Sequence, residues 1–308
     1  MKRASSMSDN SLPNLIIAGV TKGGSTSVFS YLADHPDICA SAQKEICYFM
    51  NLRFDRPLAD IAEYKQHFSH CGGIRYRMEA SPGYIYGGRK LAQGVKDALG
   101  DPKIIIVLRE PIKRIYSFFT SHQNKFIIEQ GIDFHEYLRR CKALPPEKYK
   151  KPDLYPYFQL LNGCYSEYLP AWIDIFGKNL QILFFEDLVR DNRAFMRSIC
   201  VWLGVDPCFY ENYDFVIENK TRGVKWKSIH RMVMNINDRF EKILRKNMKI
   251  KRFFRNLYYA VNEAKGQSSR ISMEDMEYLK SYYAPFNDKL ARLLRKEGYK
   301  ELPDWVNA

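Results

Sequence analysis

The chain has 308 residues, of which 46% are hydrophobic and 14% aromatic, so it can bury a sizeable core as one large domain or two small ones. No apolar run approaches the roughly 18 residues that span a bilayer, and the polar start lacks the apolar segment of a secretory signal. The formal net charge of +13 favours an anionic partner but does not identify it.

The first elements are predicted from the apolar pattern. Residues 1–12 are expected to form a flexible tail, followed by a single domain over 13–308. The apolar run 14–19 predicts a strand that enters a glycine-rich loop, and a helix is expected over 25–33.

Three further strands are predicted, over 75–81, 102–110 and 179–187. The second is apolar and β-branched, which is typical of a strand buried on both faces, and Pro111 fits the first turn of the helix after it. A single helix is expected over 186–204.

The remaining segments complete the prediction of the fold. A helix is expected to end at Gly177, a surface loop over 144–158, and mostly helix over the last 80 residues. Strands that alternate with helices predict an α/β fold, P-loop-like and three-layered. A central, mostly parallel sheet would be flanked by helices and followed by a helical C-terminal part.

The loop "AGVTKGGSTS" (18–27) differs from a nucleoside-triphosphate loop. Gly19 and Gly24 keep the glycine spacing of G-x-x-x-x-G-K-[ST], but Ser25 stands at the lysine position, and the lysine, Lys22, lies inside the loop. A glycine-rich turn that enters a helix presents several backbone N–H groups to one anion. The alternative is a tight strand-to-helix turn without a ligand.

Two later segments favour a ligand at this loop. Arg109 ends a predicted buried strand and Ser117 follows about two helical turns later, so a guanidinium and a hydroxyl are available for a second phosphate. Glu45, in "SAQKEICYFM", is suitably placed to act as a general base. The alternatives are a surface ion pair for Arg109, an ordinary helical position for Ser117, and a surface pair with Lys44 for Glu45.

Together these motifs resemble the PAPS-dependent sulfotransferases, especially the heparan sulfate N- and 3-O-sulfotransferases and their bacterial relatives. The shared patterns are K-[TG]-G-[TS]-[TS], K-E-x-x-[YF]-F and L-R-[DE]-P-x-x-R-x-x-S, and the resemblance runs from about Asn14 to Leu294. It implies transfer without a metal, with 3′,5′-ADP as the product.

The resemblance also implies roles for individual residues. Glu45 would be the catalytic base, and Lys22 would stabilise charge on the leaving oxygen. Arg109 and Ser117 would hold the 3′-phosphate. The 5′-phosphosulfate would lie in the loop of Lys22, Gly23, Gly24, Ser25, Thr26 and Ser27, and a basic C-terminal segment would supply Arg222, Lys265 and Arg270.

Two residues are candidates for contact with the acceptor. His122 follows Ser117 on the same predicted helix, and Tyr84 belongs to a tyrosine-rich stretch in which an aromatic face could stack on a sugar. For both, a structural role is the alternative.

The positive charge is concentrated in one segment. Between Arg222 and Asn256, twelve Lys and Arg stand against Asp238 and Glu241, a net +10. A solvated helical face is one interpretation, and an electropositive surface is the other. The basic and apolar residues of 239–261 also fit a module that binds anions or membrane surfaces.

The sequence therefore predicts a PAPS-dependent sulfotransferase that acts on a hydroxyl or amine of a carbohydrate, by in-line transfer. The basic balance favours an anionic glycan, and no nucleic-acid partner is expected. A P-loop-type ATP-dependent kinase and the surface-binding module remain as alternatives. Seven cysteines without a C-x-x-C pair predict reduced thiols, a cytoplasmic location and no zinc.

Overall fold

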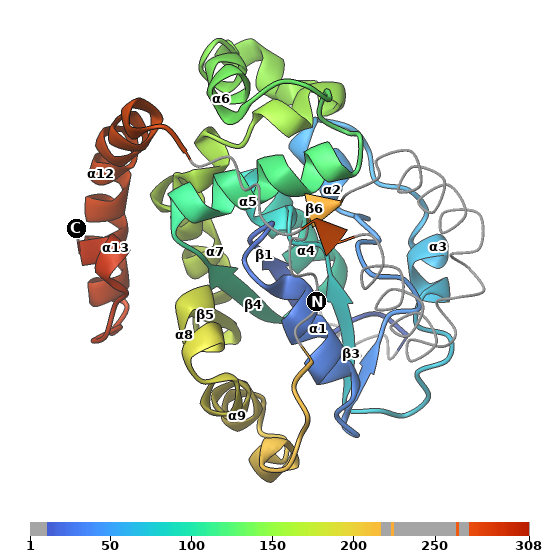
Figure 1. The fold of residues 1–308 in the computed structure, drawn as a ribbon. Helices are drawn as coiled ribbons and strands as arrows, with labels where there is room; N and C mark the ends of the chain where they lie inside the picture. Colours follow the sequence, from blue (N-terminus) through green and yellow to red (C-terminus); the bar gives the residue numbers. More distant parts are fainter. Residues whose placement is uncertain (1–10, 217–222, 225–262, 265–270, 308) are drawn as a thin grey trace.

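A computed structural model describes residues 11–216, 223–224, 263–264 and 271–307 (Figure 1). Most of the basic segment from Arg222 to Asn256 lies outside the described residues, as does most of the predicted tail.

The centre of the molecule is a five-stranded sheet with the order β2-β3-β1-β4-β5, in which every neighbouring pair is parallel. The strands are β1 (Leu15–Gly19), β2 (Ile38–Ala40), β3 (Tyr76–Ala80), β4 (Lys103–Leu108) and β5 (Leu180–Phe184). All residues of β1 and β3 are buried, and so are all but the first of β4. Strands buried on both faces are the rule where helices cover a parallel sheet.

The helices differ widely in length. They are α1 (Ser25–Ala33), α2 (Met50–Arg53), α3 (Ile61–Gln66), α4 (Gly88–Leu99), α5 (Pro111–Asn124), α6 (Phe134–Lys142), α7 (Leu169–Phe176), α8 (Phe185–Arg190), α9 (Asn192–Leu203), α12 (Met273–Lys296) and α13 (Asp304–Asn307). A separate antiparallel pair joins β6 (Gly223–Val224) and β7 (Glu263–Ala264). Among the described residues, no helix is long and apolar enough to cross a bilayer.

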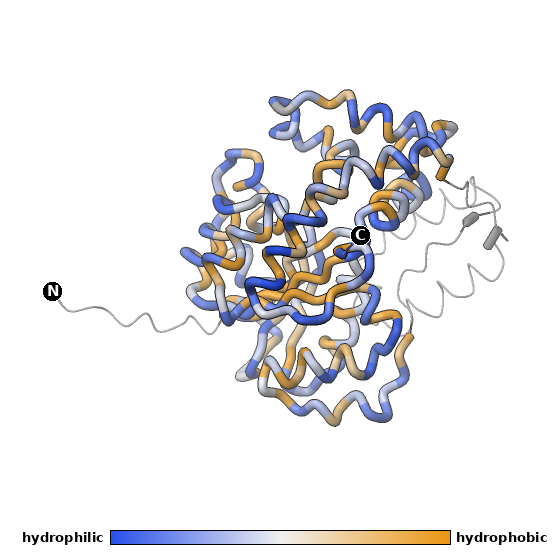
Figure 2. The backbone as a smooth tube through the Cα atoms, turned by 90° about the vertical axis from the view of Figure 1, so that its left-hand side faces the viewer, coloured by the Kyte–Doolittle hydropathy of each residue, from blue (hydrophilic) through white to orange (hydrophobic). Residues whose placement is uncertain are grey.

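Alternate residues of the central strands form two cores. Ile16 and Ile104 face one side and pack with α4, α7 and α12, whereas Ile17 and Ile105 face the other side and pack with α1 and α9. Figure 2 shows the apolar strands enclosed by segments of mixed hydropathy, and Figure 1 shows α1 in front of the sheet. The predicted three-layer α/β fold with a mostly parallel sheet is thus confirmed.

Three local expectations need correction. The single helix expected over 186–204 is divided into α8 and α9, because Asp191 is extended (φ −149°, ψ 93°) and its carboxylate accepts a hydrogen bond from the Ala194 amide. The strand β2 was not predicted. The expected loop over 144–158 contains short 3₁₀ helices and ends at the fully buried Phe158.

Candidate active site

The glycine-rich loop lies where β1 ends and α1 begins. Lys22 (φ 69°) and Gly24 (φ 90°) are both left-handed, and a turn of this kind gathers successive backbone N–H groups around one point. A β carbon on Gly23 would lie 2.4 Å from the Val107 carbonyl oxygen, so this position leaves no room for a side chain. The loop therefore lies directly against β4.

The loop leads into the N-terminus of α1. The first N–H groups of a helix have no partner within the helix, and here Gly24 precedes them at the N-cap. The amides of Ser25, Thr26 and Ser27 are thus placed for an anion, and the helix dipole favours negative charge there.

Arg109 contacts the loop directly, as the sequence predicted from the shared edge of the sheet. Its Nη1 donates a hydrogen bond of 2.9 Å to the Lys22 carbonyl oxygen, and its guanidinium lies 4.5 Å from the centre of the Phe185 ring. Its buried Nε has no hydrogen-bond partner among the described residues. The guanidinium is therefore fixed beside the loop and retains donor capacity.

Lys22 lies among other cations. Burial, together with the charges of Lys125 and Arg109, lowers the pKa of its ammonium to about 8, whereas Glu45 acts in the opposite direction. An ammonium held among positive charges in this way has a strong electrostatic preference for a nearby anion.

Glu45 faces the same charges from the segment after β2. Its Oε1 lies 2.7 Å from the Lys44 Nζ, and its side chain is 57% exposed. Partial desolvation raises the pKa of Glu45, but the charges of Lys44 and Lys125 outweigh that effect and hold the pKa below its ordinary value. The carboxylate is therefore ionised near neutral pH and able to accept a proton.

His122 also belongs to this group. Its ring stacks on Phe118 with centroids 3.6 Å apart, and its Nδ1 lies 3.0 Å from the Phe118 carbonyl oxygen. Burial lowers the pKa of His122 to about 4, and the charges of Lys125 and Lys22 contribute. The imidazole is thus neutral near neutral pH.

The structure does not bring every predicted site residue into this group. Ser117 is half-buried on α5, and its contact with the 3′-phosphate stays a prediction. Tyr84 is wholly buried, and its hydroxyl is engaged by Glu79, so its predicted role in lining an acceptor cleft is wrong. Arg222, Lys265 and Arg270 lie outside the described residues.

Sequence reasoning also missed residues at the site. Lys125 follows His122 by three positions, which is one helical turn, and that spacing could have indicated it. Glu79 gave no comparable signal, because an acidic residue within a short strand is usually solvated.

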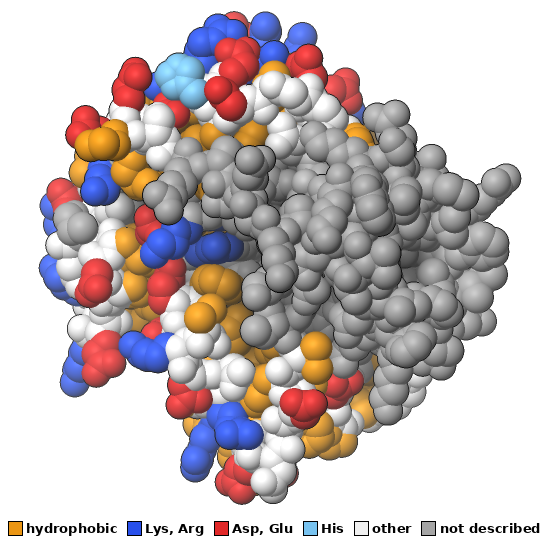
Figure 3. All heavy atoms as spheres, in the orientation of Figure 1, with side chains coloured by type: hydrophobic (Ala, Val, Ile, Leu, Met, Phe, Trp, Pro, Cys, Tyr) orange, Lys and Arg blue, Asp and Glu red, His pale blue; other side chains and the backbone are white. Residues whose placement is uncertain are grey.

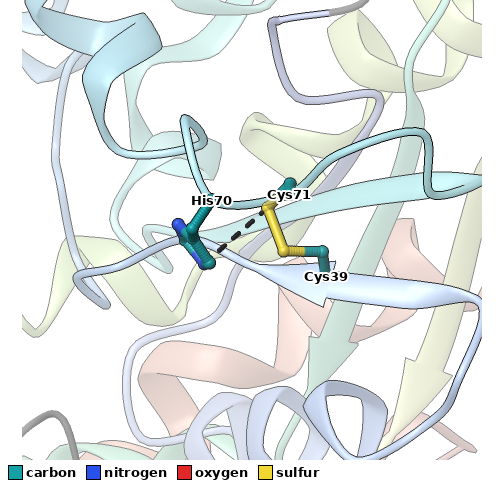
Figure 4. A group of neighbouring side chains, drawn as sticks. All are labelled: Cys39, His70 and Cys71. Atoms are coloured by element: carbon teal, nitrogen blue, oxygen red, sulfur yellow. Dashed lines mark hydrogen bonds between the residues drawn. A yellow bond between two sulfur atoms is a disulfide. The ribbon is translucent and has the colours of Figure 1, made fainter.

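The cysteines differ from the prediction of reduced thiols. Cys39 in β2 and Cys71 are joined by a disulfide, and five others are free. His70 lies beside the pair, with its Nε2 3.8 Å from the Cys71 sulfur (Figure 4). The three potential ligand atoms lie within 4.8 Å of one another, but sulfurs bonded to each other offer no thiolate to a metal. The disulfide links Cys39, which is five residues before Lys44, to the turn after α3.

Comparison with known proteins extends these observations. The family model "Sulfotransferase domain" matches residues 12–219. The bifunctional heparan sulfate N-deacetylase/N-sulfotransferase 1 of Caenorhabditis briggsae is 24% identical over 98% of this chain and 32% of its own length. The human heparan sulfate glucosamine 3-O-sulfotransferase 3B1 is 25% identical over 69% of this chain and 50% of its own.

A solved structure agrees in fold. A sulfotransferase from Alicyclobacillus acidocaldarius superposes with a TM-score of 0.66 at 22% sequence identity, over 95% of this chain and 98% of that one. The chain spans a third to a half of the length of the two curated relatives.

Proposed function

The chain belongs to the sulfotransferase domain family, and from this premise we propose that it transfers a sulfuryl group from PAPS to a hydroxyl or amine of a carbohydrate. The observation that carries the proposal is the hydrogen bond from Arg109 to the backbone of Lys22, at a glycine-rich loop that Glu45 also faces. Family membership gives no support to the kinase or to the surface-binding module.

The residues of the loop fit the proposed cofactor. Gly23 lies against β4 with no room for a side chain, and a phosphate would be bound by the backbone of the loop. The amides at the start of α1 would hold the 5′-phosphosulfate, with the Lys22 ammonium beside it. Arg109, whose Nε is buried and unpartnered among the described residues, would hold the 3′-phosphate.

The chemistry follows from the charges. PAPS supplies an activated sulfuryl group, which carries less negative charge than a terminal phosphoryl group and needs less neutralisation. Lys22 stabilises negative charge as it develops on the leaving phosphate side. Glu45, ionised because of the cations around it, takes the proton from the acceptor hydroxyl or amine.

The acceptor proposal rests on the relatives and on charge. Two of the relatives carry heparan sulfate in their names, and heparan sulfate is an anionic glycan. Lys44 and Lys125 lie beside Glu45 and would attract such an acceptor. Elsewhere on the described face, acidic and basic side chains are interspersed (Figure 3).

Two measurements test the proposal. Calorimetry should detect binding of 3′,5′-ADP to the wild type and weaker binding to Lys22→Ala. Binding of magnesium ATP without binding of 3′,5′-ADP would contradict the proposed cofactor. Purified protein should transfer labelled sulfate from PAPS to members of a panel of acidic and neutral glycans, and Glu45→Gln should lower kcat about 100- to 10,000-fold. Transfer to phenols or lipids but to no glycan would refute the carbohydrate acceptor.

A further inference from the structure

Glu79 in β3 is an acidic side chain that the proposed chemistry does not use. It is wholly buried, and among the described residues it is contacted by three hydroxyl groups and by no cation. Burying an ionised carboxylate is costly unless donors satisfy it. Here Tyr64 donates to Oε2, and Ser81 and Tyr84 both donate to Oε1.

Two of these hydroxyls connect Glu79 to the segment that carries Glu45. The Ser81 hydroxyl donates to Glu79 over 2.6 Å and accepts a hydrogen bond of 3.0 Å from the Cys47 amide. The Tyr84 hydroxyl donates over 2.7 Å and accepts one of 3.2 Å from the Phe49 amide. Each hydroxyl has a single hydrogen, which it donates to the carboxylate. A lone pair of the hydroxyl oxygen then remains to accept the hydrogen bond from the loop amide.

The loop that receives these contacts needs such support. Glu45 (φ 60°) and Cys47 (φ 58°) both have left-handed backbones, which are unfavourable for residues other than glycine. Such conformations persist where the surroundings impose them. The Glu45 amide donates to the Ala80 carbonyl oxygen over 2.9 Å, so β3 and the residues after it hold the loop at three successive points.

We propose that Glu79 is a positioning residue for Glu45. Its carboxylate orients the hydroxyls of Ser81 and Tyr84, and they hold residues 45–49 in the backbone conformation that directs the Glu45 side chain toward Lys22. This role rests on the proposed function of Glu45 as the base. It also explains why an acidic side chain is wholly buried in β3.

The two tyrosines provide a matched pair of variants. Tyr84→Phe and Tyr64→Phe each remove one hydroxyl from the same carboxylate and keep the ring, but only Tyr84 also accepts from a loop amide in the contacts described. Tyr84→Phe should lower kcat about 10- to 100-fold through misplacement of the base, with the KM for PAPS little changed. Tyr64→Phe should leave kcat close to that of the wild type. Equal losses in the two variants would overturn the proposal.

A double-mutant cycle separates positioning from a general structural effect. In a Glu45→Gln background there is no base to position, so Tyr84→Phe should cause little further loss of kcat. Losses that multiply would mean that Tyr84 acts elsewhere, and the proposal would fail. Glu79→Gln keeps an oxygen that accepts from Ser81 and Tyr84, so it should retain far more activity than Glu79→Met, which keeps none.

Hydrogen exchange distinguishes failure of this proposal from failure of the proposed function. Exchange of the Phe49 amide should become faster in Tyr84→Phe. Exchange of the Cys47 amide should become faster in Ser81→Ala. The Ser81 variant is the smaller substitution, and it tests the connection if Tyr84→Phe does not fold. Unchanged exchange in both would refute the connection itself. If Glu45→Gln alone left kcat unaltered, the assignment of the base would fail, and the positioning role with it, whatever the exchange rates.

Discussion

The charge state of Lys22 provides a direct test of the site. Burial, with Lys125 and Arg109, lowers the pKa of the free ammonium to about 8. A phosphate bound beside it favours the charged form and raises that pKa again. Binding of 3′,5′-ADP in mildly alkaline solution should therefore take up a proton from the solvent.

The size of the effect follows from the pKa. At pH 9 about nine-tenths of the free protein lacks the Lys22 proton, so binding should take up close to one proton, compared with about a tenth of a proton at pH 7. The pKa is higher in the complex than in the free protein. Full affinity is thus present below about pH 8 and decreases roughly tenfold for each unit above it, until the pKa of the complex is reached.

Titration calorimetry measures this uptake. The heat of binding at pH 9 should depend on the ionisation enthalpy of the buffer, because the buffer supplies the proton, and at pH 7 this dependence should nearly vanish. Lys22→Met, which keeps the length and loses the charge, is the control and should take up no proton at this position. The reasoning is refuted if the heat at pH 9 is independent of the buffer, or if Lys22→Met shows the same uptake as the wild type.

Three further predictions concern the surroundings of the loop. Arg109→Lys keeps the charge but loses the forked donor, so calorimetry should show an affinity for 3′,5′-ADP about 10- to 100-fold lower, and unchanged affinity would contradict the role of the guanidinium. Gly23→Ala places a β carbon 2.4 Å from a β4 carbonyl oxygen and should abolish nucleotide binding, whereas Gly73→Ala, which meets no atom within 4 Å, should not. Alkylation and mass spectrometry of non-reduced protein should find five free thiols and a Cys39–Cys71 crosslink. Because the crosslink closes a loop with a sequence separation of 32, its removal should lower the free energy of unfolding by about 3–4 kcal/mol in chemical denaturation, and an unchanged midpoint would contradict this.

The elements that could be predicted from the sequence are those with local signals. The apolar run that became β4 and the glycine spacing after β1 identified two neighbouring strands. The carboxyl ends of parallel strands share one edge of a sheet, and that rule predicted Arg109 near Lys22, as the 2.9 Å hydrogen bond shows. The strand β2 has only three residues, too few for a hydrophobic period to be recognised.

The features that could not be predicted depend on segments far apart in the chain. Nothing near Cys39 indicates that it pairs with Cys71, since the partner is chosen by how β2 and the turn after α3 lie in space. Arg114 is similar: it is wholly buried, and its guanidinium donates to both the side chain and the backbone of Gln159, 45 residues away. Arg114 is the second arginine of the pattern L-R-[DE]-P-x-x-R-x-x-S, and that position did not predict that it would be buried.

Tyr84 shows why the same residue type can mislead. A tyrosine near a predicted active site fits a sugar-stacking role, and local sequence cannot distinguish that role from burial. The distinction comes from Glu79, which cannot remain charged in the interior without donors, and Tyr84 is one of three hydroxyls that satisfy it. Once that hydroxyl is committed to Glu79, it can only accept from the loop. The tyrosine thereby acts on the conformation of the segment that bears Glu45. The sequence alone had predicted a direct contact with the acceptor.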